Sequence, residues 1–360
     1  MLPVLIFCTV LTALASLLPL SNNQHWIIRG MDFPRLQIAI IAAVLLIVDI
    51  VFLDSQSVIT WSLIMVTGVC FIWQLWWILP YTVLWSKEVK TASGHDPERQ
   101  LSILTSNVLA PNHNAEALIK LVKKYQPDVL VTLESDQWWQ DKLSVLEADM
   151  PYSIKCPLDN LYGMHVFSRL PLEEPEISYL VEEDVPSMHA YLVLRTGDKV
   201  RMHFVHPAPP SPTENEKSDK RDAELVIVAR SAAESDQPII VTGDLNDVAW
   251  SATTRLFRKI SGLLDPRVGR GMYNTFNAKY FFLRWPLDHL FHSGHFTLLS
   301  IKRLPSIGSD HFPLFTRLRF SPVSTQDQDG LNLDAGERKW SKEVTKEQSL
   351  DKDDVPKPGE

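Results

Sequence analysis

Three long apolar stretches dominate the first 85 residues of the chain. Residues 2–20 and 58–84 contain no charged side chain, and residues 36–53 contain one, Asp49. Each stretch is close to the roughly 20 residues that a helix needs to cross the apolar core of a bilayer. Tryptophans stand at or near their ends, where aromatic side chains favour the membrane interface. We therefore predict a membrane anchor of three transmembrane helices over residues 1–85, embedded in a lipid bilayer.

The first apolar stretch has an alternative interpretation as a cleaved signal peptide, because residues 13–16 loosely resemble a cleavage site. It lacks the basic start of such signals, which favours a retained helix. The basic residues Arg29, Arg35, Lys87 and Lys90 would share one side of the membrane, so the positive-inside rule favours a cytoplasmic C-terminal domain. The predicted location is a multi-pass membrane protein, in the inner membrane if the chain is bacterial. A transport role is disfavoured, because Asp49 is the one ionisable side chain in these stretches.

The remaining chain divides into a linker, a domain and a tail. Residues 86–99 are polar, with Gly and Pro, and are predicted to be a linker. Residues 100–320 alternate short strand patterns with amphipathic helical patterns such as 115–125, which predicts two packed sheets with helices outside. Residues 321–360 are rich in charge and poor in apolar side chains, which predicts a disordered charged tail.

The charge of the domain does not favour nucleic-acid binding. The formal net charge is −8, of which residues 98–320 carry −3. This near-neutral domain has no basic stripe of the kind that binds nucleic acid tightly without sequence preference. Cys156 is the one cysteine of the domain. The domain therefore cannot form an internal disulfide that would point to an oxidising compartment.

Polar residues recur at the ends of apolar strand patterns. The most informative case is the turn Gly243-Asp244-Leu245-Asn246, which follows the buried-strand pattern of residues 238–242 and presents an acid and an amide two residues apart. Each such residue alone fits a turn or a cap, but a set at one kind of location indicates a site. The set is Asn107, Glu134, His206, Asp244, Asn246, Asp288, Asp310 and His311.

Hydrolysis of a phosphate ester would use these residue types. It requires a hard cation held by oxygen atoms, an oriented water, and donors to the phosphoryl oxygens. The carboxylates of Glu134 and Asp310 suit Mg²⁺ or Mn²⁺. Asp244 can bind or orient the attacking water, with Asn246 donating to a phosphate oxygen.

The two histidines of the set suit proton transfer. His311 can be the general base, and Asp288 is an acid that could fix its tautomer and raise its basicity. His206 would then donate to the phosphate or to the leaving group.

The ordered series of motifs resembles the endonuclease/exonuclease/phosphatase superfamily, in a membrane-anchored, bacterial-type form. That superfamily includes deoxyribonucleases, sphingomyelinases and inositol phosphatases. The series covers about residues 100–320 and consists of Ser106-Asn107-Val108, Glu134 after Val-Leu-Val-Thr-Leu, Gly163 to Pro171, His206, Gly-Asp-Leu-Asn, Leu-Asp-His-Leu and Ser-Asp-His.

The resemblance implies a four-layered α/β sandwich and Mg²⁺-dependent cleavage of a phosphodiester or phosphomonoester. It also implies that Asn107 and Glu134 hold the metal, with Asp310 as a second acid on the metal side. The chain departs from the family pattern in lacking an acid shortly after Asn107. His165 stands where a small apolar residue is usual, and we expect it to pack rather than to line the site.

The leading prediction is a membrane-anchored, divalent-metal-dependent phosphoesterase, with a lipid, a nucleotide or a nucleic acid as its substrate. One alternative is a nuclease acting on DNA or RNA near the membrane. Another is a non-catalytic membrane binding module that retains the fold, although a binding surface would not need the whole set of acids, amides and imidazoles. No protein partner is predicted.

Overall fold

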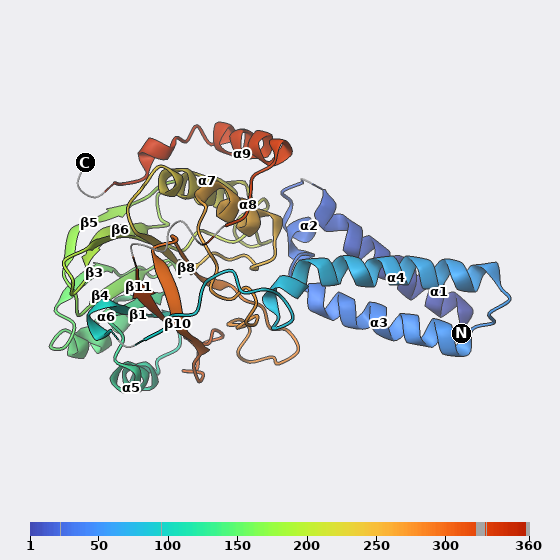
Figure 1. The fold of residues 1–360 in the computed structure, drawn as a ribbon, viewed down its shortest axis with the longest axis horizontal. Helices are drawn as coiled ribbons and strands as arrows, with labels where there is room; N and C mark the ends of the chain where they lie inside the picture. Colours follow the sequence, from blue (N-terminus) through green and yellow to red (C-terminus); the bar gives the residue numbers. More distant parts are fainter. Residues whose placement is uncertain (22, 95, 322–327, 329, 358–360) are drawn as a thin grey trace.

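An elongated bundle of helices projects from one end of an α/β domain (Figure 1). The structure is a computed structural model and describes residues 1–21, 23–94, 96–321, 328 and 330–357. The bundle consists of α1 (Leu2–Leu17), α3 (Arg35–Phe52) and α4 (Val58–Ile78). With short 3₁₀ extensions, the stretches Leu2–Leu20, Arg35–Phe52 and Val58–Tyr81 are long and apolar enough to cross a membrane. The three predicted apolar helices are therefore present.

The domain is built on two mixed β-sheets. In the first sheet the strand order is β10-β11-β1-β2-β4-β3, and in the second it is β5-β6-β7-β8-β9. The pairs β1–β2 and β7–β8 are parallel and the other pairs are antiparallel. The strands are β1 (Gln100–Asn107), β2 (Val129–Leu133), β3 (Tyr152–Cys156), β4 (Met164–Ser168), β5 (Leu172–Ser178), β6 (Ser187–Val193), β7 (Lys199–Val205), β8 (Ile239–Asp244), β9 (Asp288–His292), β10 (Phe296–Arg303) and β11 (Leu314–Phe320).

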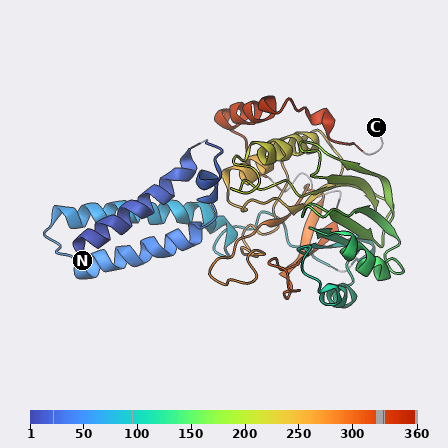
Figure 2. The ribbon, with the colours of Figure 1, turned by 180° about the vertical axis from the view of Figure 1, so that it is seen from behind.

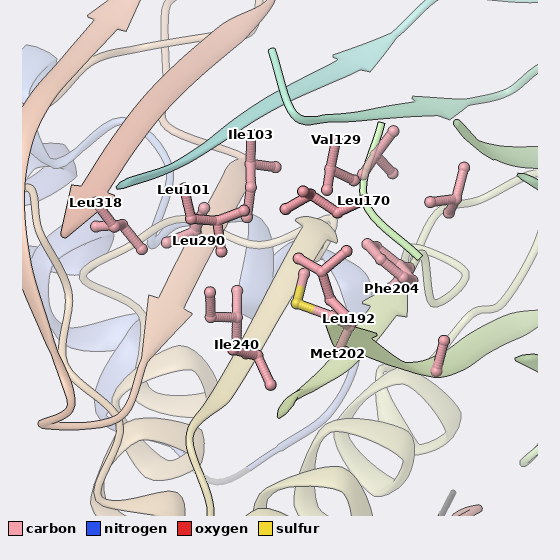
Figure 3. Close-up of a cluster of buried hydrophobic side chains, with 14 of the residues drawn as sticks. Leu101, Ile103, Val129, Leu170, Leu192, Met202, Phe204, Ile240, Leu290 and Leu318 are labelled. Atoms are coloured by element: carbon pink, nitrogen blue, oxygen red, sulfur yellow. The ribbon is translucent and has the colours of Figure 1, made fainter. Parts of the chain in front are cut away.

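The main core lies between the two sheets. Figure 3 shows Ile103 and Val129 of the first sheet facing Met202, Phe204 and Ile240 of the second, and all five side chains are buried. Burial of such side chains stabilises the fold by about 1.5–3 kcal/mol each. Because alternate residues of a strand point to opposite faces, each sheet also has an outer face to cover.

Helices cover both outer faces, which completes four layers (Figure 1). Helices α5 (Ala115–Tyr125) and α6 (Gln137–Leu143) cover the first sheet, with Leu118 and Trp139 in the same cluster as Phe167. Helices α7 (Asp219–Ala233) and α8 (Ala252–Ser261) cover the second, with Leu225 and Phe257. The predicted four-layered α/β sandwich is confirmed.

The segment predicted as a linker packs against the domain. Val89 is fully buried, and the Arg258 guanidinium pairs with the Glu88 carboxylate. The N–H of Ala92 donates to the carbonyl of Leu298 at 2.9 Å, next to a bridge between Thr91 and β10. The short 3₁₀ turn Pro97–Arg99 then leads into β1. Residues 88–92 are therefore part of the packed domain rather than a free linker.

The charged C-terminal segment contains a helix, α9 (Ala335–Glu347), where the sequence predicts disorder. A capping box between Asp334 and Glu337 starts this helix. Val344 and Trp340 then pack against Val226 of α7, and Figure 1 shows α9 lying along α7. These few apolar residues share one helix face, which composition averaged over the whole tail conceals. Residues 322–327, 329 and 358–360 of the predicted tail lie outside the described residues.

Val344→Asp is expected to release α9 from α7, because it puts an unpaired charge into a buried apolar contact. Trypsin should then cut faster at Lys339 and Lys342, while the melting temperature of the domain changes little. Mass spectrometry of timed digests measures the cleavage rates. Glu343→Asp, at an exposed position of the same helix, is the matched control. Equal rates in both variants and the parent chain would contradict the docking of α9.

The bundle and the domain share a packed interface. Trp250 is fully buried there, with Tyr81 and Ala39 from the helices. The Trp250 indole N–H donates to the carbonyl of Asp32 at 2.8 Å, and the Tyr81 hydroxyl donates to the carbonyl of Ala249 at 2.6 Å. The short helix α2 (Trp26–Gly30) lies in the loop between α1 and α3, beside the domain (Figures 1 and 2).

Candidate active site

The polar residues predicted at strand ends gather where the two sheets meet. Asn107 ends β1, Asp244 ends β8 and Asp288 begins β9. The hydroxyls of Thr105 and Thr242 lie 3.0 Å apart and join β1 to β8 across the space between the sheets. This contact holds the ends of the two central strands next to each other.

The turn after β8 requires glycine at position 243. Gly243 has φ 153°, and a Cβ atom there would lie 1.9 Å from the carbonyl oxygen of Val205 on β7. Asn246 follows with φ 51°, and its backbone N–H donates to Asp244 Oδ1 at 2.9 Å. The Asn246 side-chain amide donates to the carbonyl of Pro207 at 3.0 Å, which uses one of its two N–H groups. The turn thereby fixes the Asp244 carboxylate and leaves Asn246 one donor.

A chain of polar contacts joins five of the eight predicted residues. Asn107 Nδ2 donates to Glu134 Oε1 at 2.7 Å and to Asp244 Oδ2 at 3.2 Å. On the other side, His311 Nε2 lies 3.5 Å from Asp244 Oδ2. His311 Nδ1 lies 2.8 Å from Asp288 Oδ2. The order along this polar chain is Glu134, Asn107, Asp244, His311, Asp288.

The His311 imidazole lies between two carboxylates. Burial alone would lower the pKa of His311, but the charges of Asp288 and Asp244 raise it to about 10. Burial would raise the pKa of Asp244, but His311 and His206 together hold it below its ordinary value. In the protein without a metal, an imidazolium therefore faces Asp244.

Glu134 stands on a tight turn after β2, with φ 55°. Ser135 next to it has its hydroxyl 2.7 Å from His165 Nδ1, and Gly163 packs so closely that a Cβ atom there would lie 2.1 Å from the Ser135 carbonyl oxygen. His165 is fully buried behind this turn, in agreement with the expectation that it packs. Burial raises the pKa of Glu134 to about 7, although the Asn107 hydrogen bond opposes this.

His206 and Asp310 flank the polar chain. Burial lowers the pKa of His206 to about 4, so its imidazole is neutral and carries one N–H. Its ring centroid lies 5.3 Å from that of Tyr162. The backbone carbonyl of Asp310 accepts from the N–H of Ala278 at 2.6 Å, which ties the loop after residue 275 to the site.

Sequence reasoning did not assign a role to Ser309. Its hydroxyl donates to the carbonyl of Asn107 at 2.9 Å and accepts from the backbone N–H of His311 at 3.0 Å. Ser309 thereby joins the end of β1 to the loop that carries His311. Its position in the Ser-Asp-His motif was the one signal for this role.

A cleft of about 650 Å³ opens onto these residues. Glu134, Asn246, Asp310 and His311 line part of it. Its other lining residues are mostly apolar, and some come from the loop before α3. The cleft therefore brings ionisable groups and apolar side chains together in one lining.

The donor atoms at the site suit a hard divalent cation. Among the described residues, donor atoms of Asp244, Asp288 and His311 all lie within 4.8 Å of one another. Glu134 and Asp310 add carboxylate oxygens that face the cleft, and such oxygens are the ligands that Mg²⁺ and Mn²⁺ prefer. The amide oxygen of Asn107 accepts from the N–H of Leu109 at 3.1 Å while its nitrogen faces the carboxylates, and metal binding by Asn107 stays a prediction. In this arrangement Asn107 orients the acids.

Comparison with known proteins gives one family. The sequence profile of the Endonuclease/Exonuclease/phosphatase family matches residues 104–311, a range that contains all eight predicted residues. No curated protein sequence matches the chain significantly.

Several solved structures share the fold of the domain at low sequence identity. TDP2 of D. rerio, in complex with a single-strand DNA product, is 17% identical with a TM-score of 0.51, over 61% of this chain and 99% of that one. The human Nocturnin catalytic domain, with a bound sulfate anion, is 16% identical with a TM-score of 0.51, over 64% and 100%. An endonuclease/exonuclease/phosphatase of Bacteroides vulgatus is 16% identical with a TM-score of 0.50, over 62% and 99%. At these identities the similarity concerns the fold.

Proposed function

Because the chain belongs to the endonuclease/exonuclease/phosphatase family, whose members hydrolyse phosphoric esters with divalent metals, we propose that it is a phosphoesterase held at a membrane by its three N-terminal helices. The observation that carries the proposal is the polar chain from Glu134 through Asp244 and His311 to Asp288, at the edge of a cleft large enough for a substrate. A module that only binds would have no use for a buried imidazole between two carboxylates.

We assign proton transfer to His311. Its Nδ1 is bound to Asp288, so Nε2 is the atom that can exchange a proton toward Asp244. Asp244 would orient the attacking water beside its carboxylate and within reach of Nε2. Positive charge from a cation held near Asp244 would oppose the raising effect of that carboxylate on the pKa of His311, and a neutral Nε2 could then accept a proton from that water.

We assign the metal to the carboxylates of Glu134 and Asp310, with Asn107 as the residue that holds Glu134 in place. A bound Mg²⁺ or Mn²⁺ would supply positive charge to a phosphoryl group and its leaving oxygen. The remaining amide N–H of Asn246 and the N–H of neutral His206 would donate to phosphoryl oxygens.

The test uses the full-length chain in detergent micelles with bis(p-nitrophenyl) phosphate, a soluble phosphodiester, and p-nitrophenyl phosphate, a soluble monoester. Hydrolysis is expected with Mg²⁺ or Mn²⁺ and should stop with EDTA. Asp244→Ala and His311→Ala should each lower the rate by about 10²-fold or more, since each removes a group that acts on the water.

Glu116→Ala is the matched control, because Glu116 is an exposed acid on α5, outside the site. It should keep the parent rate. Activity that survives both Asp244→Ala and His311→Ala would refute the assignment of the site residues. Activity that survives EDTA would refute the proposed metal dependence.

A further inference from the structure

A row of aromatic rings connects the catalytic histidine to the helical bundle. The ring of Phe276 lies 5.0 Å from that of His311, and Trp285 stacks on Phe276 at 6.1 Å. Phe33, from the loop just before α3, then meets Trp285 edge-on at 5.6 Å. Phe33, Phe276 and Trp285 all line the cleft. One wall of the cleft is therefore apolar from the bundle to the reacting groups.

A second feature lies on the same side of the cleft. The aromatic loop, which we define as residues 279–284, has four consecutive large apolar side chains on the surface, between 37% exposed for Leu283 and 78% for Phe281. The loop begins with Lys279 and ends with Arg284. Exposed apolar clusters of this kind mark contact surfaces, because water is a poor solvent for them.

Contacts at both ends fix where this loop lies. Ala278 donates to the Asp310 carbonyl at 2.6 Å, and the Arg284 guanidinium lies 5.0 Å from the ring centre of Phe312. The side-chain amide of Gln37 donates to the carbonyl of Phe282 at 2.8 Å. Gln37 is in the first turn of α3, so the loop lies beside the domain end of this apolar helix (Figures 1 and 2).

This position is where a bilayer surface would lie if the three helices cross the membrane. Aromatic side chains favour the interface between lipid tails and headgroups, and lysine and arginine favour the headgroup phosphates. The aromatic loop has both, in the order basic, aromatic, basic. It therefore matches a membrane surface in chemistry as well as in position.

The cleft lining argues against a nucleic-acid substrate. Among the described residues, the lining includes the acids Glu134, Glu214 and Asp310 but no lysine or arginine. A polynucleotide needs cationic side chains along its path for its backbone phosphates. A substrate with one phosphate ester at the catalytic groups and an apolar remainder needs none.

We propose, on the basis of the proposed function, that the substrate is a membrane phospholipid. Its phosphate ester lies at Asp244 and His311, and the hydrocarbon nearest the phosphate lies against Phe33, Phe276 and Trp285. The aromatic loop inserts into the interface beside the cleft and guides the lipid out of the bilayer. Water attacks phosphorus, the bond from phosphorus to one ester oxygen breaks, and that oxygen leaves with a proton as an alcohol.

The experiment compares lipids, a soluble phosphodiester and a single-stranded oligonucleotide as substrates of the same protein. The full-length chain in lipid nanodiscs or mixed micelles is assayed on phosphatidylglycerol, phosphatidylethanolamine and sphingomyelin, and separately on bis(p-nitrophenyl) phosphate. The double variant Phe281→Ser/Phe282→Ser is expected to lower the best lipid rate at least 10-fold more than the rate on the soluble diester. Tyr152→Ser is the matched control, since Tyr152 is an exposed aromatic residue on β3, away from the bundle.

Each outcome decides the proposal. Lipid hydrolysis that falls with the aromatic loop and not with Tyr152 supports it. It is overturned if the soluble diester is cleaved but no lipid is, if a single-stranded oligonucleotide is cleaved faster than any lipid, or if the double variant affects both substrates equally. If neither the soluble diester nor any lipid is cleaved, the proposed function fails first, and the lipid assignment fails with it.

Discussion

Asp288→Asn is expected to lower the rate of phosphoester hydrolysis by about 10²- to 10⁴-fold, the range that general acid–base groups contribute. Asp288 accepts from His311 Nδ1 at 2.8 Å and so keeps Nε2 directed toward Asp244. An asparagine amide can instead donate to Nδ1, which would leave the proton of a neutral imidazole on Nε2, the atom that has to accept one. Steady-state rates with saturating Mg²⁺ measure the loss.

The same substitution gives a pH signature that a purely structural role would not. The negative charge of Asp288 raises the pKa of His311, so its removal should lower that pKa, and the limb of the pH–rate profile that belongs to His311 should move to lower pH. Asp236→Asn, at an exposed position near the far end of β8, is the control and should leave the profile unchanged. An Asp288→Asn rate within about fivefold of the parent rate would exclude the assigned role.

Gly243→Ala is expected to destabilise the domain by about 3–5 kcal/mol, which is large for a single methyl group. The added Cβ atom would lie 1.9 Å from the carbonyl oxygen of Val205, a backbone atom of the paired strand that cannot rotate away. The positive φ of this position adds strain. Thermal and denaturant unfolding in detergent measure the change, with bound metal removed from both proteins.

Gly197→Ala separates the effect of the contact with Val205 from the effect of the positive φ. Gly197 also has a positive φ, 84°, but no atom lies within 4 Å of the position of its Cβ. Its cost should be about 1–2 kcal/mol, from backbone strain alone. If the two alanine variants lose equal stability, the contact with Val205 is not the cause and the account of the turn is wrong.

The elements that sequence predicted best are those that bury one side. Residues 115–125 have apolar side chains at helical spacing, and α5 occupies the same residues. The strand pattern before Gly243 became β8, which is buried along its whole length. In such segments the periodicity of apolar residues follows the geometry of the buried face, so it can be read without knowing the partner.

The elements that sequence missed owe their structure to a partner. Strand β5 contains Glu173, Glu174 and Pro175, a composition poor in strand formers, and is held as an edge strand by pairing with β6. Helix α9 depends on a small apolar face against α7. The α9 contact cannot be read from the local pattern because α7 and α9 lie far apart in the chain, and β5 lacks the apolar alternation that marks a strand.

The features of the site also divide into those that the sequence predicted and those that depend on the folded structure. Residue types and order predicted the polar set, since polar groups that recur at buried strand ends cost stability unless they are paired or used. The protonation of His206 and His311 was not predictable, because it depends on how deeply the fold buries each ring and on which carboxylates it brings near. The apolar wall was missed as well, since Phe33 and Trp285 meet only in the folded protein.

The contacts of Trp250 and Tyr81 have a consequence for how the protein could exist in a cell. Trp250 follows the catalytic turn by only a few residues, and Ala39, Tyr81 and the Asp32 carbonyl cover it from the side of the helices. A chain cut after Tyr81 would lose these partners and leave a large apolar surface next to Asp244 open to water. We therefore expect a form released from its helices to be less stable around Asp244 and less active than the intact chain.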